Sequence, residues 1–278
     1  MKQLNFELKK FNRFLLKEER EKGTIEKYLR DLKVFLSWLD GKTVSKASAI
    51  SWKQYLLSTG YASATINSML ASVNKYFAFL GRSEWKVKYL RIQRKIFRNT
   101  EKELTKEEYM RLLETARGIG RERLSLLMES ICVSGIRVSE VRYITVEAAY
   151  KGYAEVCLKG KIRMVLLPGK LCRKLLKYAK TQKITSGEIF ITRSGKGVSR
   201  RQIWAEMKTL CKLAKVKPSK VFPHNLRHLF AKKFYAVCRD IVKLADVLGH
   251  SSIETTRIYL ASTGVEYNRQ IEKLGLIY

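Results

Sequence analysis

Apolar residues recur every three to four positions through much of the chain, and glycines divide this pattern into segments. That spacing places apolar side chains on one face of an α-helix. The first 81 residues hold four such segments, and the last three of them end at Gly41, Gly60 and Gly81. Glycine is favoured just beyond a helix because it adopts the left-handed conformation without steric cost. We therefore expect a domain of four helices, with Thr24 as the N-cap of the second helix.

The rest of the chain combines helical segments with one predicted β-hairpin. LTKEEYMRLLETA opens with Thr105 and Glu108 at capping-box spacing, so a helix is expected to begin there. RERLSLLMESICVSG is typical of a largely buried helix. In YAEVCLKGKIRMVLLP, two runs rich in β-branched residues flank a Lys-Gly-Lys turn and predict a hairpin. After Pro168 the pattern is helical again, apart from a short strand or turn in EIFITRSGKG. The predicted fold class is therefore mainly α with a small β-hairpin.

A strongly basic segment without clean periodicity separates the two parts. It reads RSEWKVKYLRIQRKIFRN and begins at Arg82. Such a segment either lies along a polyanion or is a solvated run of charge. We predict a helical domain over residues 1–81, a basic linker over 82–102 and an α+β domain over 103–278.

The charge of the chain points to a polyanionic partner. Its 278 residues carry 56 Lys and Arg against 25 Asp and Glu, a formal net charge of +31. So large an excess opposes compaction by self-repulsion, and nucleic acid is the first partner to consider because its phosphates exchange counterions for Lys and Arg. A membrane surface fits less well, since the basic residues are spread along the chain rather than gathered on one amphipathic segment. No apolar run long enough for a membrane span is present, and the N-terminus is too charged for a secretory signal.

Cysteine spacing favours a reducing compartment. The five cysteines are widely separated and none forms a Cys-x-x-Cys pair. This pattern is typical of free thiols in a cytoplasmic protein rather than of disulfides or a zinc site. No cluster of carboxylates suited to Mg²⁺ is visible either, so neither a cofactor nor a metal is expected.

Two local motifs of the second domain offer cations suited to a phosphate. In VSGIRVSEV, Arg137 follows a turn glycine and could present two parallel N–H donors to an anion. Lys159 and Lys161 flank Gly160 at the predicted hairpin tip, where a flexible lysine could reach a ligand and donate a proton. Each motif alone is weak, since a lysine at a hairpin tip is normally solvated.

Two further motifs contain histidines. In FPHNLRHLFAKKF, His224 and Arg227 are three residues apart and so share one helix face. In VLGHSSIETTRIYL, Gly249 ends one helix, His250 follows it, and a second helix is expected to carry Tyr259. A tyrosine between two apolar residues is, by itself, more typical of core packing. Because His224 and His250, two of the chain's only three histidines, are the ones that these motifs single out, a shared site is favoured.

Taken together, SGIRVSE, the lysine hairpin, HNLRH and LGHSSIETTRIY resemble, in the same order, the motifs of the tyrosine recombinase (phage integrase) family. The helical N-terminal part resembles that family's core-binding domain, so the resemblance covers nearly the whole chain and fits the two-domain, Xer-like members. It implies two domains that form a C-shaped clamp on DNA. It also implies a catalytic set of Arg137, Lys159, His224, Arg227, His250 and Tyr259, with the tyrosine as nucleophile. The hairpin tip is shorter than the family's Gly-Lys-Gly-Asn-Lys pattern, which leaves Lys161 as an alternative to Lys159.

The resemblance implies an enzyme that cleaves and rejoins double-stranded DNA at specific sites through a covalent 3′-phosphotyrosine, without metal or ATP. Arg137 and Arg227 would bind the non-bridging phosphate oxygens, and His250 would donate a further hydrogen bond. His224 would accept the proton of the tyrosine, and Lys159 would protonate the leaving 5′-oxygen. Whether the outcome is integration, excision, inversion or resolution stays open.

Other expectations concern neighbouring residues and assembly. Glu140 is expected to orient another group or cap a helix, and His228 to be structural or solvent-facing. Residues Val265–Leu274 are expected to form a short helical tail, packed either on the same chain or on a neighbour. The resemblance favours a homotetramer on two DNA sites, with a monomer in solution. Two rival functions remain: a type IB topoisomerase, and a DNA-binding module without catalysis.

Overall fold

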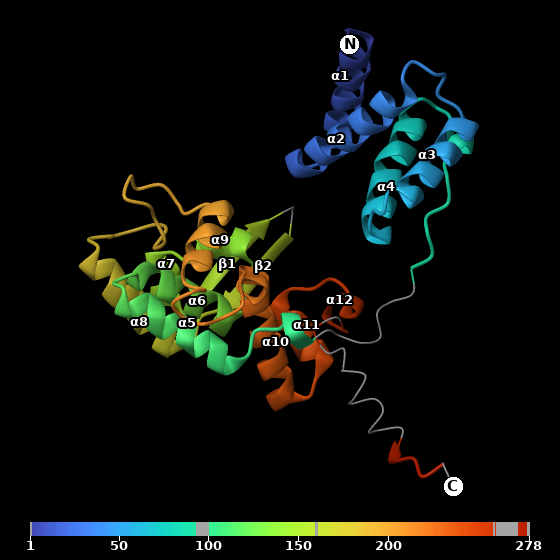
Figure 1. Cartoon of the computed structure of the whole chain (residues 1–278). Helices are drawn as coiled ribbons and strands as arrows, with labels where there is room; N and C mark the ends of the chain where they lie inside the picture. The colour runs from blue at the N-terminus through green and yellow to red at the C-terminus, as the bar shows by residue number, and fades with distance from the viewer. Residues whose placement is uncertain (1, 93–99, 159–160, 258, 260–271, 277–278) are drawn as a thin grey trace. The chain divides into compact units, whose positions relative to one another are not determined.

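The computed structural model describes residues 2–92, 100–158, 161–257, 259 and 272–276. The chain divides into two compact units, Met1–Arg94 and Lys95–Tyr278 (Figure 1). Both are built mainly from helices, and the sheet of the described residues has two antiparallel strands. The predicted fold class is confirmed. In the described part of the chain, no helix has the length and apolar character needed to cross a membrane.

The first unit consists of four helices, as predicted: α1 (Lys2–Lys17), α2 (Lys22–Leu39), α3 (Lys46–Ser58) and α4 (Ser63–Phe79). Their apolar faces enclose a core of large side chains that includes Phe11, Phe35, Trp52 and Phe77. Burying each such aromatic ring stabilises a domain by about 1.5–3 kcal/mol relative to leaving it in water. The short 3₁₀ turn η1 (Ser83–Trp85) follows, and Trp85 packs edge-on against the core.

The helix ends show which local signals were decisive. Gly41, Gly60 and Gly81 all adopt positive φ directly after helices, as their positions predict. The prediction of Thr24 as an N-cap was wrong. Helix α2 begins at Lys22, and its first backbone bonds run to the Glu21 carbonyl, including one from Thr24 N. One extra helical turn therefore outweighs the capping preference of a single threonine.

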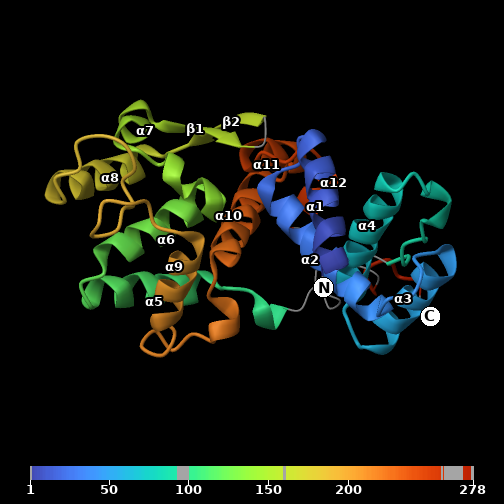
Figure 2. The same ribbon diagram turned by 90° about the horizontal axis from the view of Figure 1, so that it is seen from above.

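The second unit surrounds one buried helix. Helix α6 (Glu122–Ser134) packs against the neighbouring helices and carries buried residues on most of its surface, as predicted (Figures 1 and 2). The helices that pack against α6 are α5 (Lys106–Gly118), α8 (Gly169–Thr181), α9 (Arg200–Thr209) and α10 (Pro223–Cys238). The unit also contains the helices α7 (Val146–Lys151), α11 (Ile241–Leu248) and α12 (Ile253–Arg257), and the 3₁₀ turns η2 (Thr100–Lys102), η3 (Val138–Tyr143) and η4 (Pro218–Lys220).

Two predicted local structures are present here. Thr105 and Glu108 form a reciprocal capping box at the start of α5. The hairpin consists of β1 (Tyr153–Leu158) and β2 (Lys161–Leu166), paired from Tyr153 with Leu166 to Leu158 with Lys161. Alternation along β2 places Val165 in the core and leaves Ile162, Met164 and Leu166 exposed. EIFITRSGKG forms a turn with two isolated bridges, Glu188 with Thr145 and Ile191 with Gly197, rather than a full strand.

Gly135 closes α6 in a space that has no room for a side chain. It adopts φ +65°, and a Cβ at this position would lie 2.5 Å from the Phe230 ring on α10. We expect Gly135→Ala to destabilise the protein by about 1–3 kcal/mol through overpacking, beyond the cost of a left-handed alanine. Gly120→Ala is the matched control, because Gly120 has φ +70° but nothing within 4 Å of its Cβ position. Urea unfolding measures both variants, and equal losses would contradict the packing argument.

Candidate active site

Two predicted site arginines meet at the C-terminal end of α11. Arg137 donates from Nη2 to the Gly249 carbonyl at 3.1 Å. Arg227 donates from Nη2 to the adjacent Leu248 carbonyl at 2.8 Å, and from Nη1 to the Gly135 carbonyl. Carbonyls at the end of a helix carry partial negative charge, which stabilises cations placed there. The fold thus holds two like-charged guanidinium groups at neighbouring carbonyls.

The two arginines differ in their access to solvent. Arg227 is 3% exposed, and burial followed by the charge of Arg137 lowers its pKa to about 10, while a hydrogen bond with Tyr259 acts in the opposite direction. Arg227 therefore stays charged at neutral pH. The Arg137 side chain is 39% exposed. An anion can reach Arg137 from solvent, whereas Arg227 forms the buried side of the site.

Glu140 fixes the position of Arg137. One carboxylate oxygen accepts from Arg137 Nη1 at 3.0 Å, and the other accepts from the Arg137 backbone N–H at 3.0 Å. The second oxygen also accepts from Arg163 Nη2 at 2.5 Å. Burial alone would raise the pKa of Glu140, but hydrogen bonds from Arg163 and Arg137 hold it below the ordinary value. The expected orienting and capping roles of Glu140 are both confirmed.

His250 sits between Arg227 and α12. Its Nε2 lies 2.9 Å from Arg227 Nη2, and its Nδ1 lies 2.9 Å from the hydroxyl of the buried Thr256. Because a guanidinium only donates, Nε2 must be the acceptor, so the ring is neutral with its proton on Nδ1. Burial and then the charges of Arg227 and Arg137 lower the pKa of His250 to about 4. The imidazole is therefore held neutral across the physiological range.

A pH titration tests this placement of His250. In the folded protein without DNA, we expect the imidazole NMR signals of His250 to change near pH 4. Because the folded pKa lies below the unfolded value of about 6.5, stability is intact above pH 6.5 and falls as the pH drops from 6.5 toward 4. A bound DNA phosphate would offset the nearby cations, so DNA should raise the pKa of His250. A titration that DNA leaves unchanged would contradict a phosphate site beside this ring.

Tyr259 is both a core residue and a member of the site. It is 5% exposed and packs with Ala231, Leu244 and Leu248. Its ring centroid lies 5.7 Å from that of His250, and its side chain hydrogen-bonds Arg227. Core packing, one of the two alternatives that the sequence presented, is therefore observed for Tyr259, and its role as the nucleophile stays a prediction. The helix expected to carry it is shorter, since α12 ends two residues before Tyr259.

The start of α10 brings two histidines to the tyrosine. His224 is exposed, and its ring centroid lies 5.9 Å from that of Tyr259. His228 is buried, lies 4.9 Å from the Tyr259 ring and has Nε2 3.9 Å from a Glu103 carboxylate oxygen. Of the two alternatives expected for His228, structural or solvent-facing, the structure supports the structural one. Its i, i+4 spacing from His224 placed both rings on one helix face and could have indicated this contact.

Several predictions lie outside the described residues. The hairpin tip, Lys159 and Gly160, is one of them, and of Lys161 only the backbone pairing at the start of β2 is described. Lys159 as the catalytic lysine, with Lys161 as the alternative, stays a prediction. Most of the expected tail helix Val265–Leu274 is also outside them.

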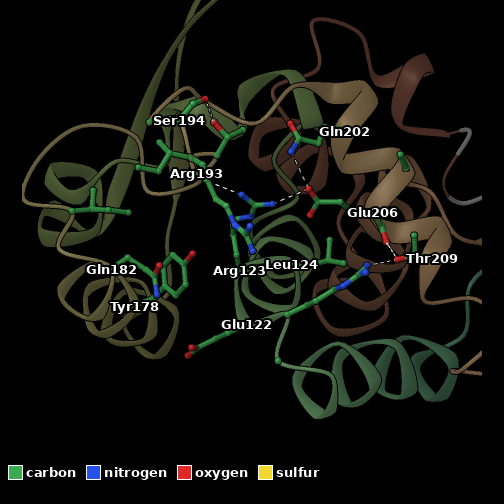
Figure 3. Close-up of a pocket in the computed structure, with 17 residues that line it drawn as sticks. Glu122, Arg123, Leu124, Tyr178, Gln182, Arg193, Ser194, Gln202, Glu206 and Thr209 are labelled. Atoms are coloured by element: carbon green, nitrogen blue, oxygen red, sulfur yellow. Dashed lines mark hydrogen bonds and ion pairs between the residues drawn. The ribbon is translucent and has the colours of Figure 1, made fainter.

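A large pocket lies at a different place in the fold. It has a volume of about 1090 Å³ and lies between the N-terminal end of α6, the ends of α8 and α9, and residues 191–195 (Figure 3). Arg123 crosses it, donating to the Ile191 carbonyl at 2.6 Å and to Glu206 at 2.7 Å. None of the predicted site residues lines this pocket. Among the described residues, no group of His, Cys, Asp or Glu is arranged to hold a metal ion.

Comparisons with known proteins agree with this geometry. Residues 102–265 match the phage integrase family, and residues 8–84 match the phage integrase N-terminal SAM-like domain. Tyrosine recombinase XerA of Pyrococcus furiosus is 30% identical over 278 residues, covering 97% of this chain and 94% of the relative. Tyrosine recombinase XerD of Staphylococcus saprophyticus is 29% identical over 263 residues, covering 86% and 89%.

Solved structures share the fold. XerH site-specific recombinase, bound to its difH substrate before cleavage, superposes with a TM-score of 0.68 at 20% identity, covering 89% of this chain and 79% of that one. A lambda integrase dimer bound to a core site gives a TM-score of 0.71 at 16% identity, covering 92% and 94%. The family matches over both parts of the chain and the Xer relatives show the class: a tyrosine recombinase. This chain belongs to the phage integrase family.

Proposed function

We propose that this recombinase breaks and rejoins DNA at specific sites through a covalent bond between Tyr259 and a 3′-phosphate. One observation carries the proposal: the Tyr259 side chain hydrogen-bonds Arg227, and Arg227 and Arg137 donate to neighbouring carbonyls. A tyrosine and two fixed cations thus share one site. A phosphodiester bound there would have its charge neutralised next to an incoming nucleophile.

Phosphate binding is the first step. Arg137, on the exposed side of the site, would pair with one non-bridging oxygen, and Arg227 would face the other from the buried side. Guanidinium donors suit this task because they form short, charge-assisted hydrogen bonds to phosphate oxygens. The five-coordinate transition state carries more negative charge than the ground state. Preorganised cations therefore stabilise it preferentially.

Attack by the tyrosine is the second step. The Tyr259 hydroxyl forms a bond to phosphorus while the bond from phosphorus to the 5′-oxygen breaks. The tyrosine proton would pass to His224, and Lys159 would give a proton to the leaving 5′-oxygen. The phosphodiester is exchanged for a phosphotyrosine of similar energy. A 5′-hydroxyl from another strand can therefore reverse the reaction without ATP.

His250 must change its protonation state before it can donate a hydrogen bond to the phosphate. In the structure its Nε2 accepts from Arg227, so it carries no hydrogen there. To donate to a phosphate, the ring must shift its proton to Nε2 or become an imidazolium. A phosphate that draws Arg227 Nη2 toward itself frees Nε2 and adds negative charge, and both effects favour the protonated ring.

Double-stranded DNA carrying a recombination site would be the partner, in the cytoplasm. The net charge of +31 supports this, as do fold relatives whose structures hold DNA. Exchange of strands between two duplexes requires two active sites on each, which a homotetramer on two DNA sites would provide. The chain segment after Tyr259 would link protomers or pack on its own domain.

The function is tested in two stages. Covalently joined DNA is first captured from a random library and sequenced to find the preferred site. A plasmid with two copies of that site is then incubated with the protein. We expect deletion or inversion between the sites. Relaxation of supercoils without exchanged products would favour a type IB topoisomerase, and the absence of both adducts and products would favour a module that only binds DNA.

A further inference from the structure

Arg163 is a part-buried arginine that connects three parts of the site. It lies on β2 between the exposed Ile162 and Met164, so its side chain points to the opposite, inner face. Nη2 donates to Glu140 at 2.5 Å, and Nη1 donates to the Val247 carbonyl at 3.3 Å. The side chain is 15% exposed. It joins the hairpin, η3 and the last turn of α11.

The turn after α11 contacts the Arg163 side chain so closely that only a glycine fits at position 249. Gly249 has φ +62°, and a Cβ built there would collide with Arg163 Cδ, Nε and Nη1. The Gly249 carbonyl accepts from Arg137, and the next residue is His250. Arg163 therefore packs directly against the backbone of Gly249, which accepts a hydrogen bond from Arg137 and precedes His250.

The charges explain why an arginine is needed. The buried Glu140 carboxylate lies between the guanidinium groups of Arg163 and Arg137. Removing one partner of such a buried group leaves charge that is only partly compensated. Without Arg163, Glu140 would lose the hydrogen bond to the oxygen that also accepts from the Arg137 backbone. Glu140 could then rotate, and Arg137 would lose its fixed direction.

We propose that Arg163 is a positioning residue that holds Glu140, and through it Arg137, in the geometry for phosphate binding. This inference rests on the proposed function, in which Arg137 binds the scissile phosphate. The hydrogen bonds of Arg163 run to Glu140, which holds Arg137, and to the Val247 carbonyl, so the role we assign to it is to orient Arg137.

Arg123 provides a matched control. It too is a part-buried arginine of the second unit, with 25% of its side chain exposed, and it donates to one carbonyl and one glutamate (Figure 3). It lies in the first turn of α6, whereas Gly135 of the site follows the last turn of the same helix. Arg123→Met therefore reports what losing a comparable arginine costs the fold alone.

The experiment compares two substrates that differ only at the scissile phosphate. One is a phosphodiester, and the other is a methylphosphonate, in which a methyl group replaces one non-bridging oxygen and removes the negative charge. A neutral phosphorus centre depends less on a correctly placed cation. We expect Arg163→Met to slow covalent adduct formation about 10²-fold on the phosphodiester and much less on the methylphosphonate. DNA binding, measured in the Tyr259→Phe background, should change little.

Controls separate the possible failures. Arg163→Lys keeps the charge and part of the reach, so it should show the same substrate pattern at smaller magnitude, even if Arg163→Met folds poorly. Arg163 variants that behave like Arg123→Met, or that lose the same factor on both substrates, would overturn the positioning role. If the wild-type protein forms no adduct, the proposed function fails and this inference fails with it. If the wild-type protein does form the adduct, a negative result with the Arg163 variants contradicts only the positioning role of Arg163.

Discussion

Arg227→Ala is expected to abolish strand cleavage and also to destabilise the second unit, whereas Arg137→Ala is expected to abolish cleavage with little loss of stability. The two arginines share a proposed role in phosphate binding but differ in their environment. Arg227 is 3% exposed and is hydrogen-bonded to two carbonyls, those of Gly135 and Leu248. Leaving a buried polar group without its partner costs about 1–3 kcal/mol, and here two carbonyls are affected at once.

Arg137 can be removed at lower cost to the fold. Its side chain is 39% exposed, and its carboxylate partner Glu140 keeps the ion pair with Arg163. In the proposed reaction, each arginine supplies charge that grows in importance in the transition state, so each loss should slow adduct formation by at least about 10²–10³-fold. Urea unfolding and adduct kinetics on a nicked substrate measure the two effects separately. An Arg137→Ala protein as unstable as Arg227→Ala, or an active Arg227→Ala protein, would contradict the site.

Tyr259→Phe is expected to form no covalent adduct while folding and binding DNA almost normally. The ring packs with Ala231, Leu244 and Leu248, and phenylalanine keeps that contact. What is lost is the hydroxyl, which is the proposed nucleophile and a hydrogen-bond partner of Arg227. Removing the attacking atom leaves no route to a phosphotyrosine, so the loss should reach the detection limit.

Tyr259→Ala serves as the contrasting variant. It removes the ring as well, and emptying a buried aromatic site costs about 3–5 kcal/mol. Thermal unfolding should therefore separate the two substitutions, although both abolish cleavage. Persistent adducts with Tyr259→Phe would show that another residue attacks the phosphate. A Tyr259→Phe protein as unstable as Tyr259→Ala would show that the hydroxyl, rather than the ring, supports the local packing.

Much of the fold could be predicted because its signals are local. Helical apolar spacing, the Thr105 and Glu108 capping box and the glycine stops each act within one or two turns of chain. The prediction of Thr24 as an N-cap was wrong because the capping preference of a threonine, about 1 kcal/mol, competes with the gain from adding a helical turn before it. The local sequence does not show which of the two is larger.

The site could be predicted in part, for the same reason. Arg137, His224, Arg227, His250 and Tyr259 stand in short motifs, and the structure brings these five together. Arg163 was not predicted as a site residue because its partners, Glu140 and Val247, are 23 and 84 residues away in sequence. The alternation of β2, which places Arg163 on the inner face of the strand, could have indicated a buried ion pair. Thr256, whose hydroxyl accepts the Nδ1 proton of His250, lies in a motif that the sequence singles out, but this contact arises only through packing.

The most direct test of the central claim is the chemical identity of the covalent link. The adduct formed on a nicked substrate is digested with trypsin and nuclease and fragmented in a mass spectrometer. Cleavage after Arg257 and Arg269 gives the peptide IYLASTGVEYNR, which contains both Tyr259 and Tyr267. We predict a nucleotide joined through its 3′-phosphate to Tyr259. A link through a 5′-phosphate, or to Tyr267 or any other residue, would contradict the account.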